Sequence, residues 1–406
     1  MEYLNNLNAE QKEAVLHTEG PLLILAGAGT GKTRVLTTRI AHILLQKLAF
    51  PSQILAVTFT NKAANEMQQR IQKLLGDFYS PLYYVGTFHA INAKILRQHH
   101  ECIGLKSNFT IIDEKESKSL LQDIIKQMGQ DFSTLAVQSL SAAQQQFKAE
   151  LEQATTRNEL IGQVAGFIET WKNLGLAPHQ ISEEQAASCA YGYGKEIYQR
   201  YQDALLRQNN CDFGDLLLRP LQLFQQKPEI LEYYQKKFRY IMVDEYQDTN
   251  TAQYLWLRLL SQKAAQGSNI CCVGDDDQSI YGWRGARVEN ILSFEKHFPQ
   301  AKIVYLQKNY RSTAPILATA SALISRNQAR FEKTLIAHTD KPSAPKVTLS
   351  RVADDQVEAL TIAHTILNLV QNNHKLNDMA ILIRSKAQLK KLEDGLRLCN
   401  IPHNLV

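Results

Sequence analysis

The stretch Leu22–Arg34, LLILAGAGTGKTR, constrains the fold of this chain more than any other feature. Four apolar residues lead into a turn of small residues, and a glycine, a lysine and a threonine follow at the expected start of a helix. Backbone N–H groups of such a loop close around a polyphosphate, and the helix dipole adds partial positive charge. The lysine can reach the β- and γ-phosphates, and the threonine hydroxyl can ligate Mg²⁺. The stretch predicts an α/β fold with a nucleotide site formed by Ala28, Gly29, Thr30, Gly31, Lys32 and Thr33.

The loop departs in one place from the usual spacing G-x-x-x-x-G-K-[ST], because Ala26 stands where the first glycine is expected. Gly27, Gly29 and Gly31 still supply the backbone freedom that the turn needs. The alternative interpretation is a glycine-rich turn that closes an ordinary βα unit. The strand and helix that flank the loop favour the nucleotide site.

The composition bounds the class of protein. A length of 406 residues suits two or three domains, and 44% hydrophobic with 21% charged residues is typical of a soluble globular protein. The net charge of +5 is compatible with nucleic acid without requiring it. The six cysteines form no C-x-x-C pair, which argues against structural zinc and for a reducing cytoplasm. No apolar run has the length of a membrane span, and we expect neither a membrane nor a signal peptide.

Gln11 lies in a predicted helix just upstream of the loop, with Asn8 as its expected N-cap. Its amide could read an adenine edge with one donor and one acceptor. By its pattern alone, the residue is more simply interpreted as a solvent-facing helix position.

Two further predicted strands carry polar residues at their carboxyl ends. Residues 54–60, ILAVTFT, form a continuous apolar run, and Asn61 is expected to cap the next helix. Residues 85–89, VGTFH, indicate a short strand end with His89 exposed beyond it. Ligands of open α/β sheets bind at this edge, which gives both segments a functional interpretation. A single histidine is more often structural, and no serine or cysteine pattern indicates nucleophilic catalysis.

The composition of the chain changes between residues 92 and 195. This part is rich in Gln, Lys, Glu and Ser and has almost no pattern typical of strands. We interpret this part as an all-helical insertion into an α/β domain formed by 1–91 and 196–300. Its sequence carries no chemistry that we can identify.

The α/β pattern resumes with a buried strand in 238–250 that ends in Asp244 and Glu245. A carboxylate at a strand end beside a phosphate loop can hold Mg²⁺, and its neighbour can act as general base for water. Acid pairs at this place also cap the next helix, but a phosphate loop needs such a partner.

A second strand, in 269–286, ends in three aspartates and Gln278, which is placed to sense the γ-phosphate or its water. Tyr281 and Trp283 follow, and their rings suggest base stacking, with core packing as the alternative. Arg311, after a third strand in 302–312, is a candidate arginine finger.

The remaining residues predict alternating elements. We expect strands at 347–351 and 379–385, helices at 357–370 and 386–398, and the first residues of another strand at 401–406.

Together these blocks resemble the UvrD/Rep-like family of superfamily 1 DNA helicases. The blocks, in the family's order, are LNAEQ, AGAGTGKTR, AVTFTNKAANEM, GTFH, DFGDLL (212–217), VDEYQDTN, VGDDDQSIYGWRGA and NYRS, with weaker similarity at FEK (331–333) and MAILIRS (379–385). The resemblance implies two RecA-like domains with ATP between them. It also implies that single-stranded DNA, reached at single/double-strand junctions, is moved 3′→5′ by opening and closing of the cleft.

Carried over residue by residue, the resemblance implies that Gln11 reads the adenine and that Arg34 and Tyr310 sandwich it. It also implies that Thr33 and Asp244 hold Mg²⁺.

The resemblance further implies catalytic roles for four residues. Lys32 binds phosphate, Glu245 is the base, Gln278 couples the γ-phosphate to DNA, and Arg311 is the first arginine finger. The DNA contacts that it implies are Phe59, Asn61, His89, Tyr281 and Trp283.

No stretch between 313 and 406 resembles the family's last two motifs, which carry a second arginine finger and further DNA contacts. We therefore expect the front half of a helicase, with 301–406 as the first part of a second RecA-like domain and with apolar faces left uncovered. Such a chain should bind ATP, hydrolyse it slowly and unwind nothing without its missing half or a partner subunit.

Two other classes stay open at this point. One is a non-catalytic DNA- or partner-binding module that keeps the fold without turnover. The other is an unrelated P-loop ATPase, such as a transporter subunit or a nucleotide kinase, in which the DDDQSIYGWRGA block is not expected.

Overall fold

The computed structural model describes residues 2–78, 80–133, 142–152, 154–262, 269–338 and 344–405. The chain divides into two compact units, Met1–Ala344 and Pro345–Val406, which are described separately. None of the helices in the described ranges is long and apolar enough to cross a membrane.

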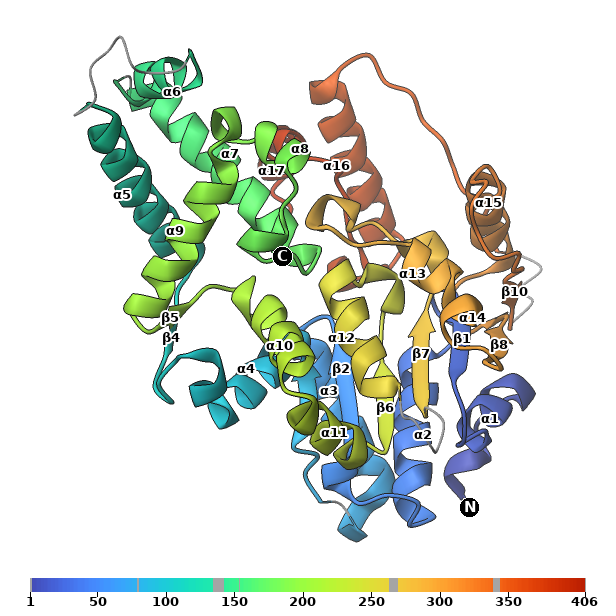
Figure 1. The fold of residues 1–406 in the computed structure, drawn as a ribbon. Coiled ribbons are helices and arrows are strands. Elements are labelled where there is room, and N and C mark those ends of the chain that lie inside the picture. The colour runs from blue at the N-terminus through green and yellow to red at the C-terminus, as the bar shows by residue number, and fades with distance from the viewer. Residues whose placement is uncertain are drawn as a thin grey trace. The chain divides into compact units, whose positions relative to one another are not determined.

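A six-stranded parallel sheet forms the centre of the first unit, with the strand order β3-β2-β6-β7-β1-β8 (Figure 1). Most of its strands are continuous apolar runs buried on both faces, as parallel sheets require. The strands are β1 (Leu22–Ala26), β2 (Ile54–Thr58), β3 (Tyr84–Thr87), β6 (Tyr240–Val243), β7 (Ile270–Gly274) and β8 (Lys302–Leu306).

The sixth strand, β8, lies in a different sheet from the one that the sequence suggested. We expected β8 to open the second RecA-like domain, but it pairs in parallel with β1 from Leu22↔Lys302 to Ala26↔Leu306. The residues 302–306 therefore complete the first sheet and place the NYRS block next to the phosphate loop. Where the family's domains begin and end along the chain stays a prediction.

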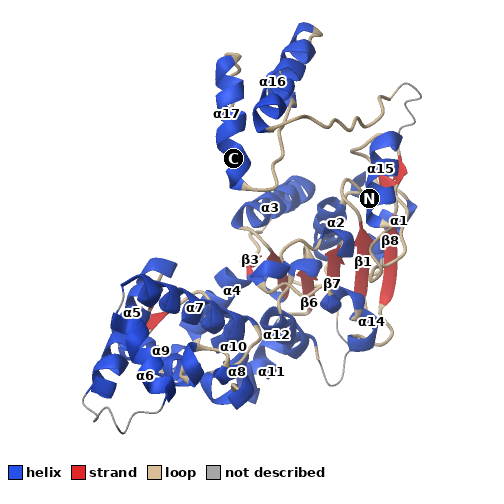
Figure 2. Ribbon diagram, turned by 90° about the horizontal axis from the view of Figure 1, so that it is seen from above, coloured by secondary structure: helices blue, strands red, loops and turns tan. Residues whose placement is uncertain are grey.

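Helices cover both faces of the sheet, and the strands alternate their side chains between two cores. In β1, Leu22 and Ile24 pack with one face and Leu23 and Leu25 with the other. Figure 2 shows α2 and α3 on one side of the strands and α12 and α14 on the other. The covering helices are α1 (Ala9–Leu16), α2 (Lys32–Leu45), α3 (Asn61–Leu75), α4 (Phe88–Gln98), α10 (Asp215–Gln226), α11 (Pro228–Lys237), α12 (Thr251–Ser261), α13 (Glu289–Leu292) and α14 (Phe294–His297).

Two helix starts differ from the sequence prediction by a residue or more. Thr60, not Asn61, caps α3, since its hydroxyl accepts the Ala63 N–H at 3.1 Å. The predicted strand end at 85–89 is confirmed, since β3 stops at Thr87, but α4 begins at once and His89 lies in its first turn.

The predicted insertion is helical, with one departure. Its helices share a core of their own and are α5 (Glu114–Ser133), α6 (Ala142–Glu152), α7 (Ala154–Asn173), α8 (Glu183–Ala187) and α9 (Gly194–Arg207). The departure is a parallel pair of two-residue strands, β4 (Thr110–Ile111) and β5 (Asn210–Cys211), too short to give a periodic signal. Residues 134–141 and 153 of the predicted insertion lie outside the described residues.

The first unit ends with β9 (Lys308–Asn309), α15 (Ala314–Ile324) and β10 (Ile336–Ala337). β9 and β10 form a two-stranded parallel sheet.

In the second unit the described residues form two α-helices, α16 (Asp355–Gln371) and α17 (Leu389–Leu398), which pack against each other, and two short 3-10 helices at Leu376–Asp378 and Lys386–Gln388. The predicted strands at 347–351 and 379–385 are wrong, and residues 401–405 form none either, since 344–405 contains no strand. A strand is stable only when it pairs with a neighbour, and in the described residues neither segment is paired with a strand. Leu349 and Leu382 are 98% and 95% exposed, in line with the expected uncovered apolar surface.

Candidate nucleotide and nucleic-acid site

The phosphate loop runs from the end of β1 to the first turn of α2, as the sequence predicts. Gly29 and Gly31 have φ values of 77° and 92°, which favour glycine. The Thr30 hydroxyl donates a hydrogen bond to the Gly27 carbonyl at 2.8 Å and closes the turn. A Cβ atom at Gly29 would lie 2.6 Å from the Cβ of Arg311, so the loop requires glycine there for packing as well.

The NYRS block is hydrogen-bonded to backbone carbonyls of this loop. Asn309 is buried, and its amide donates to the Ala28 carbonyl, while the Tyr310 N–H donates to the Gly29 carbonyl at 2.9 Å. The same Asn309 side chain accepts the Arg311 N–H at 2.9 Å. These bonds hold Arg311 beside the phosphate loop with its side chain exposed, as an arginine finger requires.

Gln11 is buried, with only 1% of its surface exposed, so the solvent-facing interpretation is wrong. Its Nε2 donates to the Thr30 carbonyl at 2.8 Å, and its Oε1 accepts the Asn8 N–H at 3.2 Å. One end of the amide therefore holds the loop, and the other belongs to the capping box at the start of α1. Its role toward an adenine, and those of Arg34 and Tyr310, stay predictions.

Arg34 and Tyr310 are both exposed. Arg34 borders a hollow of about 280 Å³ that is cationic because Arg70 and Lys73 also line it. The hydroxyl of Tyr310 accepts a hydrogen bond from the Asn8 amide at 3.1 Å.

The acid pair lies directly behind the loop. Lys32 Nζ is 2.9 Å from Glu245 Oε2, and Glu245 has a left-handed backbone with φ of 50°. Asp244 is buried at the end of β6. Burial, together with the charge of Glu245, raises the pKa of Asp244 to about 6, although Lys32 acts in the opposite direction.

A buried carboxylate with a raised pKa fits a divalent cation, because a cation stabilises its charged form. The described residues hold no group of three or more His, Cys, Asp or Glu side chains that could hold a metal ion. Asp244 and Thr33 supply oxygen donors of the kind that Mg²⁺ prefers, and nucleotide phosphates would supply others.

Sequence reasoning missed Gln247, which joins the two halves of the site. It is 1% exposed, its Nε2 donates to Glu245 Oε2 at 2.8 Å, and its Oε1 accepts the Asp275 N–H at 3.0 Å. A Cβ atom at Gly274 would lie 2.6 Å from this Oε1, which explains the glycine at the end of β7. A continuous polar path thus runs from Lys32 to the turn after β7.

Gln278 lies in that turn, half-buried, and its Nε2 donates to Asp275 Oδ2. The predicted coupling residue is therefore held by the aspartate that Gln247 contacts.

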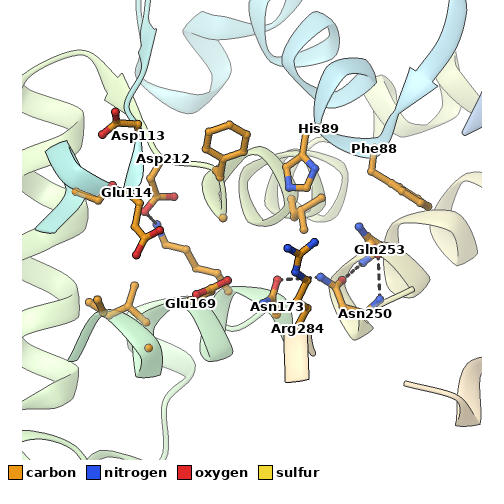
Figure 3. Close-up of a pocket in the computed structure, with 18 of the residues that line it drawn as sticks. Phe88, His89, Asp113, Glu114, Glu169, Asn173, Asp212, Asn250, Gln253 and Arg284 are labelled. Atoms are coloured by element: carbon orange, nitrogen blue, oxygen red, sulfur yellow. Dashed lines mark hydrogen bonds and ion pairs between the residues drawn. The ribbon is translucent and has the colours of Figure 1, made fainter. Parts of the chain in front are cut away.

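A cleft of about 880 Å³ opens between the carboxyl edge of the sheet and the helical insertion, and Figure 3 shows part of its lining. Four of the five predicted DNA contacts line it, and Asn61, exposed at the start of α3, does not. The four are Phe59, His89, Tyr281 and Trp283.

Three of these side chains form one aromatic group. The rings of Phe59 and Tyr281 stack with centroids 4.9 Å apart, and Tyr281 lies 6.4 Å from Trp283. Trp283 is 74% exposed, so the core-packing interpretation is wrong. The Arg284 guanidinium, 4.6 Å from the Trp283 ring centroid, adds a cation beside a stacking face.

His89 is half-buried, not exposed as predicted, and burial lowers its pKa to about 4. It is therefore neutral at pH 7. Its ring meets Phe213 edge-on at 5.8 Å, and Phe213 is 58% exposed in the same cleft. Sequence reasoning missed Phe213, although the DFGDLL block contains it.

The insertion contributes a buried cation to the cleft lining, which its sequence did not reveal. Lys172 of α7 is 1% exposed and forms ion pairs with Asp212 at 2.6 Å and Asp215 at 2.9 Å. These aspartates flank Phe213, so the ion pairs fix the backbone that presents its ring. Asp113, Glu114 and Glu169 make this end of the cleft acidic (Figure 3).

The fold and site define a P-loop protein with an aromatic cleft at the ligand edge of a RecA-like sheet. A family profile described as the UvrD/REP helicase N-terminal domain matches residues 7–299, and one described as the UvrD-like helicase C-terminal domain matches residues 304–406. The chain belongs to the UvrD/REP helicase family.

Its curated relatives are similar along the whole chain. The DNA helicase II of Rickettsia typhi is 46% identical over 407 residues, covering 100% of this chain and 57% of the relative. A probable DNA helicase II homolog of Rickettsia conorii is 45% identical, covering 100% and 58%. The ATP-dependent DNA helicase PcrA of Staphylococcus aureus is 42% identical, covering 99% and 51%. The chain thus spans little more than half the length of the relatives it matches.

Proposed function

We propose that this chain acts as an ATP-dependent 3′→5′ DNA helicase or translocase of the UvrD/Rep type in DNA repair or replication. It would couple ATP hydrolysis to movement on single-stranded DNA, with Mg²⁺ as cofactor, and would work at the nucleoid in the cytoplasm. The observation that most supports this function is a path of hydrogen bonds that joins the phosphate loop to the turn after β7, beside the aromatic cleft. The path runs through Lys32, Glu245, Gln247 and Asp275.

Nucleotide binding would begin at the phosphate loop, where N–H groups and Lys32 take the phosphates. Lys32 would then exchange Glu245 for a phosphate oxygen and leave the carboxylate free to accept a proton from water. That water oxygen attacks the γ-phosphorus while the bond to the ADP oxygen breaks, and Arg311 stabilises the charge that develops. Thr33 and Asp244 would hold Mg²⁺, which would supply positive charge to neutralise the nucleotide phosphates.

DNA binding would rest on the aromatic cleft. Stacking is worth about 1–3 kcal/mol per base and tolerates every base, which suits an enzyme that moves along any sequence. The cleft of about 880 Å³ offers room for bases splayed from a single strand, and its acidic end disfavours a phosphate backbone there.

A second candidate is a DNA- and ATP-binding module that does not unwind. The second unit favours it, because its described residues 345–405 form two α-helices with exposed apolar side chains and contain no strand. Both candidates bind ATP and DNA at the same site, and they differ in whether ATP hydrolysis drives unwinding.

Equilibrium binding tests the shared part. Titrations of a fluorescent ATP analogue, with and without Mg²⁺, and of a labelled oligothymidine should both saturate with one site per chain. Lys32→Ala should weaken binding of the ATP analogue and leave the dissociation constant of oligothymidine within about threefold of the wild-type value. Binding of neither probe would overturn both candidates.

A further inference from the structure

Five charged side chains gather at the turn after β7. Lys333 Nζ, 5% exposed, is 2.8 Å from Asp275 Oδ1 and 3.0 Å from Asp277 Oδ2, and it also pairs with Asp276. Arg330 makes a bidentate pair with Asp277 at 2.8 and 2.7 Å. Three carboxylates thus face two cations from the segment between α15 and β10.

Asp275 is shared between this cluster and the proposed site. Its Oδ1 contacts Lys333 at 2.8 Å and also accepts the Asp277 N–H at the longer distance of 3.2 Å, and its Oδ2 accepts the hydrogen bond from Gln278 Nε2. Its backbone N–H donates to Gln247. The orientation of the Gln278 amide therefore depends on where Lys333 holds the Asp275 carboxylate.

We propose that Lys333 is a positioning residue that, through Asp275, fixes the Gln278 amide in the orientation that couples nucleotide binding to DNA binding. A buried ammonium between three carboxylates leaves the Asp275 side chain little freedom to rotate. Arg330 differs, because both of its hydrogen bonds go to Asp277. The inference rests on the proposed function, since Gln278 has a coupling role only if both ligands bind.

Coupling is measurable without turnover. The dissociation constant of a non-hydrolysable fluorescent ATP analogue is determined with and without saturating oligothymidine, and the ratio of the two reports the coupling. We expect a ratio of about fivefold or more in the wild-type chain. Lys333→Met and Gln278→Ala should each bring the ratio near one. The variant that combines Lys333→Met with Gln278→Ala should show the same ratio as either single variant.

Two controls separate positioning from simple loss of fold. Arg330→Met removes a cation from the same cluster and should lower the melting temperature while keeping the wild-type ratio. Lys333→Met combined with Asp276→Asn keeps the net charge of the cluster and should fold, yet still lose the coupling.

The outcomes distinguish the two proposals. If the charge-balanced double variant keeps the wild-type ratio while Gln278→Ala loses it, the role of Lys333 is overturned and the proposed function stands. If the wild-type chain binds neither probe, or binds both with a ratio of one, the coupled function is overturned together with the inference.

Discussion

The ammonium of Lys32 and the carboxylate of Glu245 form an ion pair of 2.9 Å across the phosphate loop. The pair joins the residue proposed to bind phosphate to the residue proposed to activate water. In this arrangement each holds the other in place, and an incoming nucleotide must compete for the lysine.

The two members should therefore respond differently to substitution. Lys32→Ala removes a charge-assisted contact of about 1.5–3 kcal/mol and should weaken binding of an ATP analogue about 10- to 100-fold. Glu245→Gln removes a competitor for Lys32 and should leave binding equal or tighter. Weakened binding in Glu245→Gln by isothermal titration calorimetry would contradict this order.

Trp283 should contribute to DNA binding without contributing to stability. Because the ring is 74% exposed beside Arg284, Trp283→Ala should cost about 1–3 kcal/mol in single-strand affinity and leave the melting temperature nearly unchanged. Affinity should fall with salt at a log–log slope of about −0.7 per phosphate contact. Phe50→Ala is the matched control, since Phe50 is 73% exposed and does not line the cleft. Equal affinity of the two variants in fluorescence anisotropy would remove the stacking role.

His89 should make the chain sensitive to acid. Its pKa of about 4 lies below the ordinary value of 6.5, so the unfolded state binds the proton first as the pH falls. Stability is unaffected above pH 6.5 and is lost between pH 6.5 and 4, by at most about 2 kcal/mol at pH 5. His89→Asn should remove this loss, visible as a smaller shift in urea midpoint between pH 7.5 and pH 5. An unchanged shift would show that His89 titrates normally.

The buried ion pairs of Lys172 should matter far more than exposed ones. Lys172→Met removes the cation that pairs with both Asp212 and Asp215 and leaves Arg219, 3.5 Å from Asp215, to balance two carboxylates. We expect a loss of about 3–5 kcal/mol in unfolding free energy. Lys195→Met, which breaks the exposed pair with Glu183, should cost about 0–1 kcal/mol. Similar denaturation midpoints for both variants would contradict a structural role for the Lys172 ion pairs.

Local patterns predicted the elements whose signal lies within the chain segment itself. The phosphate loop and the acid pair after β6 were recognised by their residue types after an apolar strand. The helices of the insertion were recognised by their periodicity. The structure has all of these elements where the sequence predicts them. The residues of a strand do not indicate which other strand it pairs with. For this reason β8 was assigned to the wrong sheet, and the apolar segments at 347–351 and 379–385 were taken for strands.

The same limit applies within the site. Stacking candidates could be named because aromatic residues near a strand end are unusual, and four of the five predicted DNA residues line one cleft. Gln247, Lys172 and Lys333 act through contacts with residues far away in sequence. Single buried amides and lysines leave no pattern along the chain, so only the fold reveals them.

The rate of ATP hydrolysis with and without single-stranded DNA shows directly whether the phosphate loop and the aromatic cleft work together. It should be measured on the purified chain and on its Glu245→Gln variant, with equal nucleotide occupancy verified for both. We predict slow hydrolysis that rises when oligothymidine is added and disappears in Glu245→Gln. A hydrolysis rate that does not change when DNA is added, or that stays at the wild-type value in Glu245→Gln, would contradict the proposed mechanism.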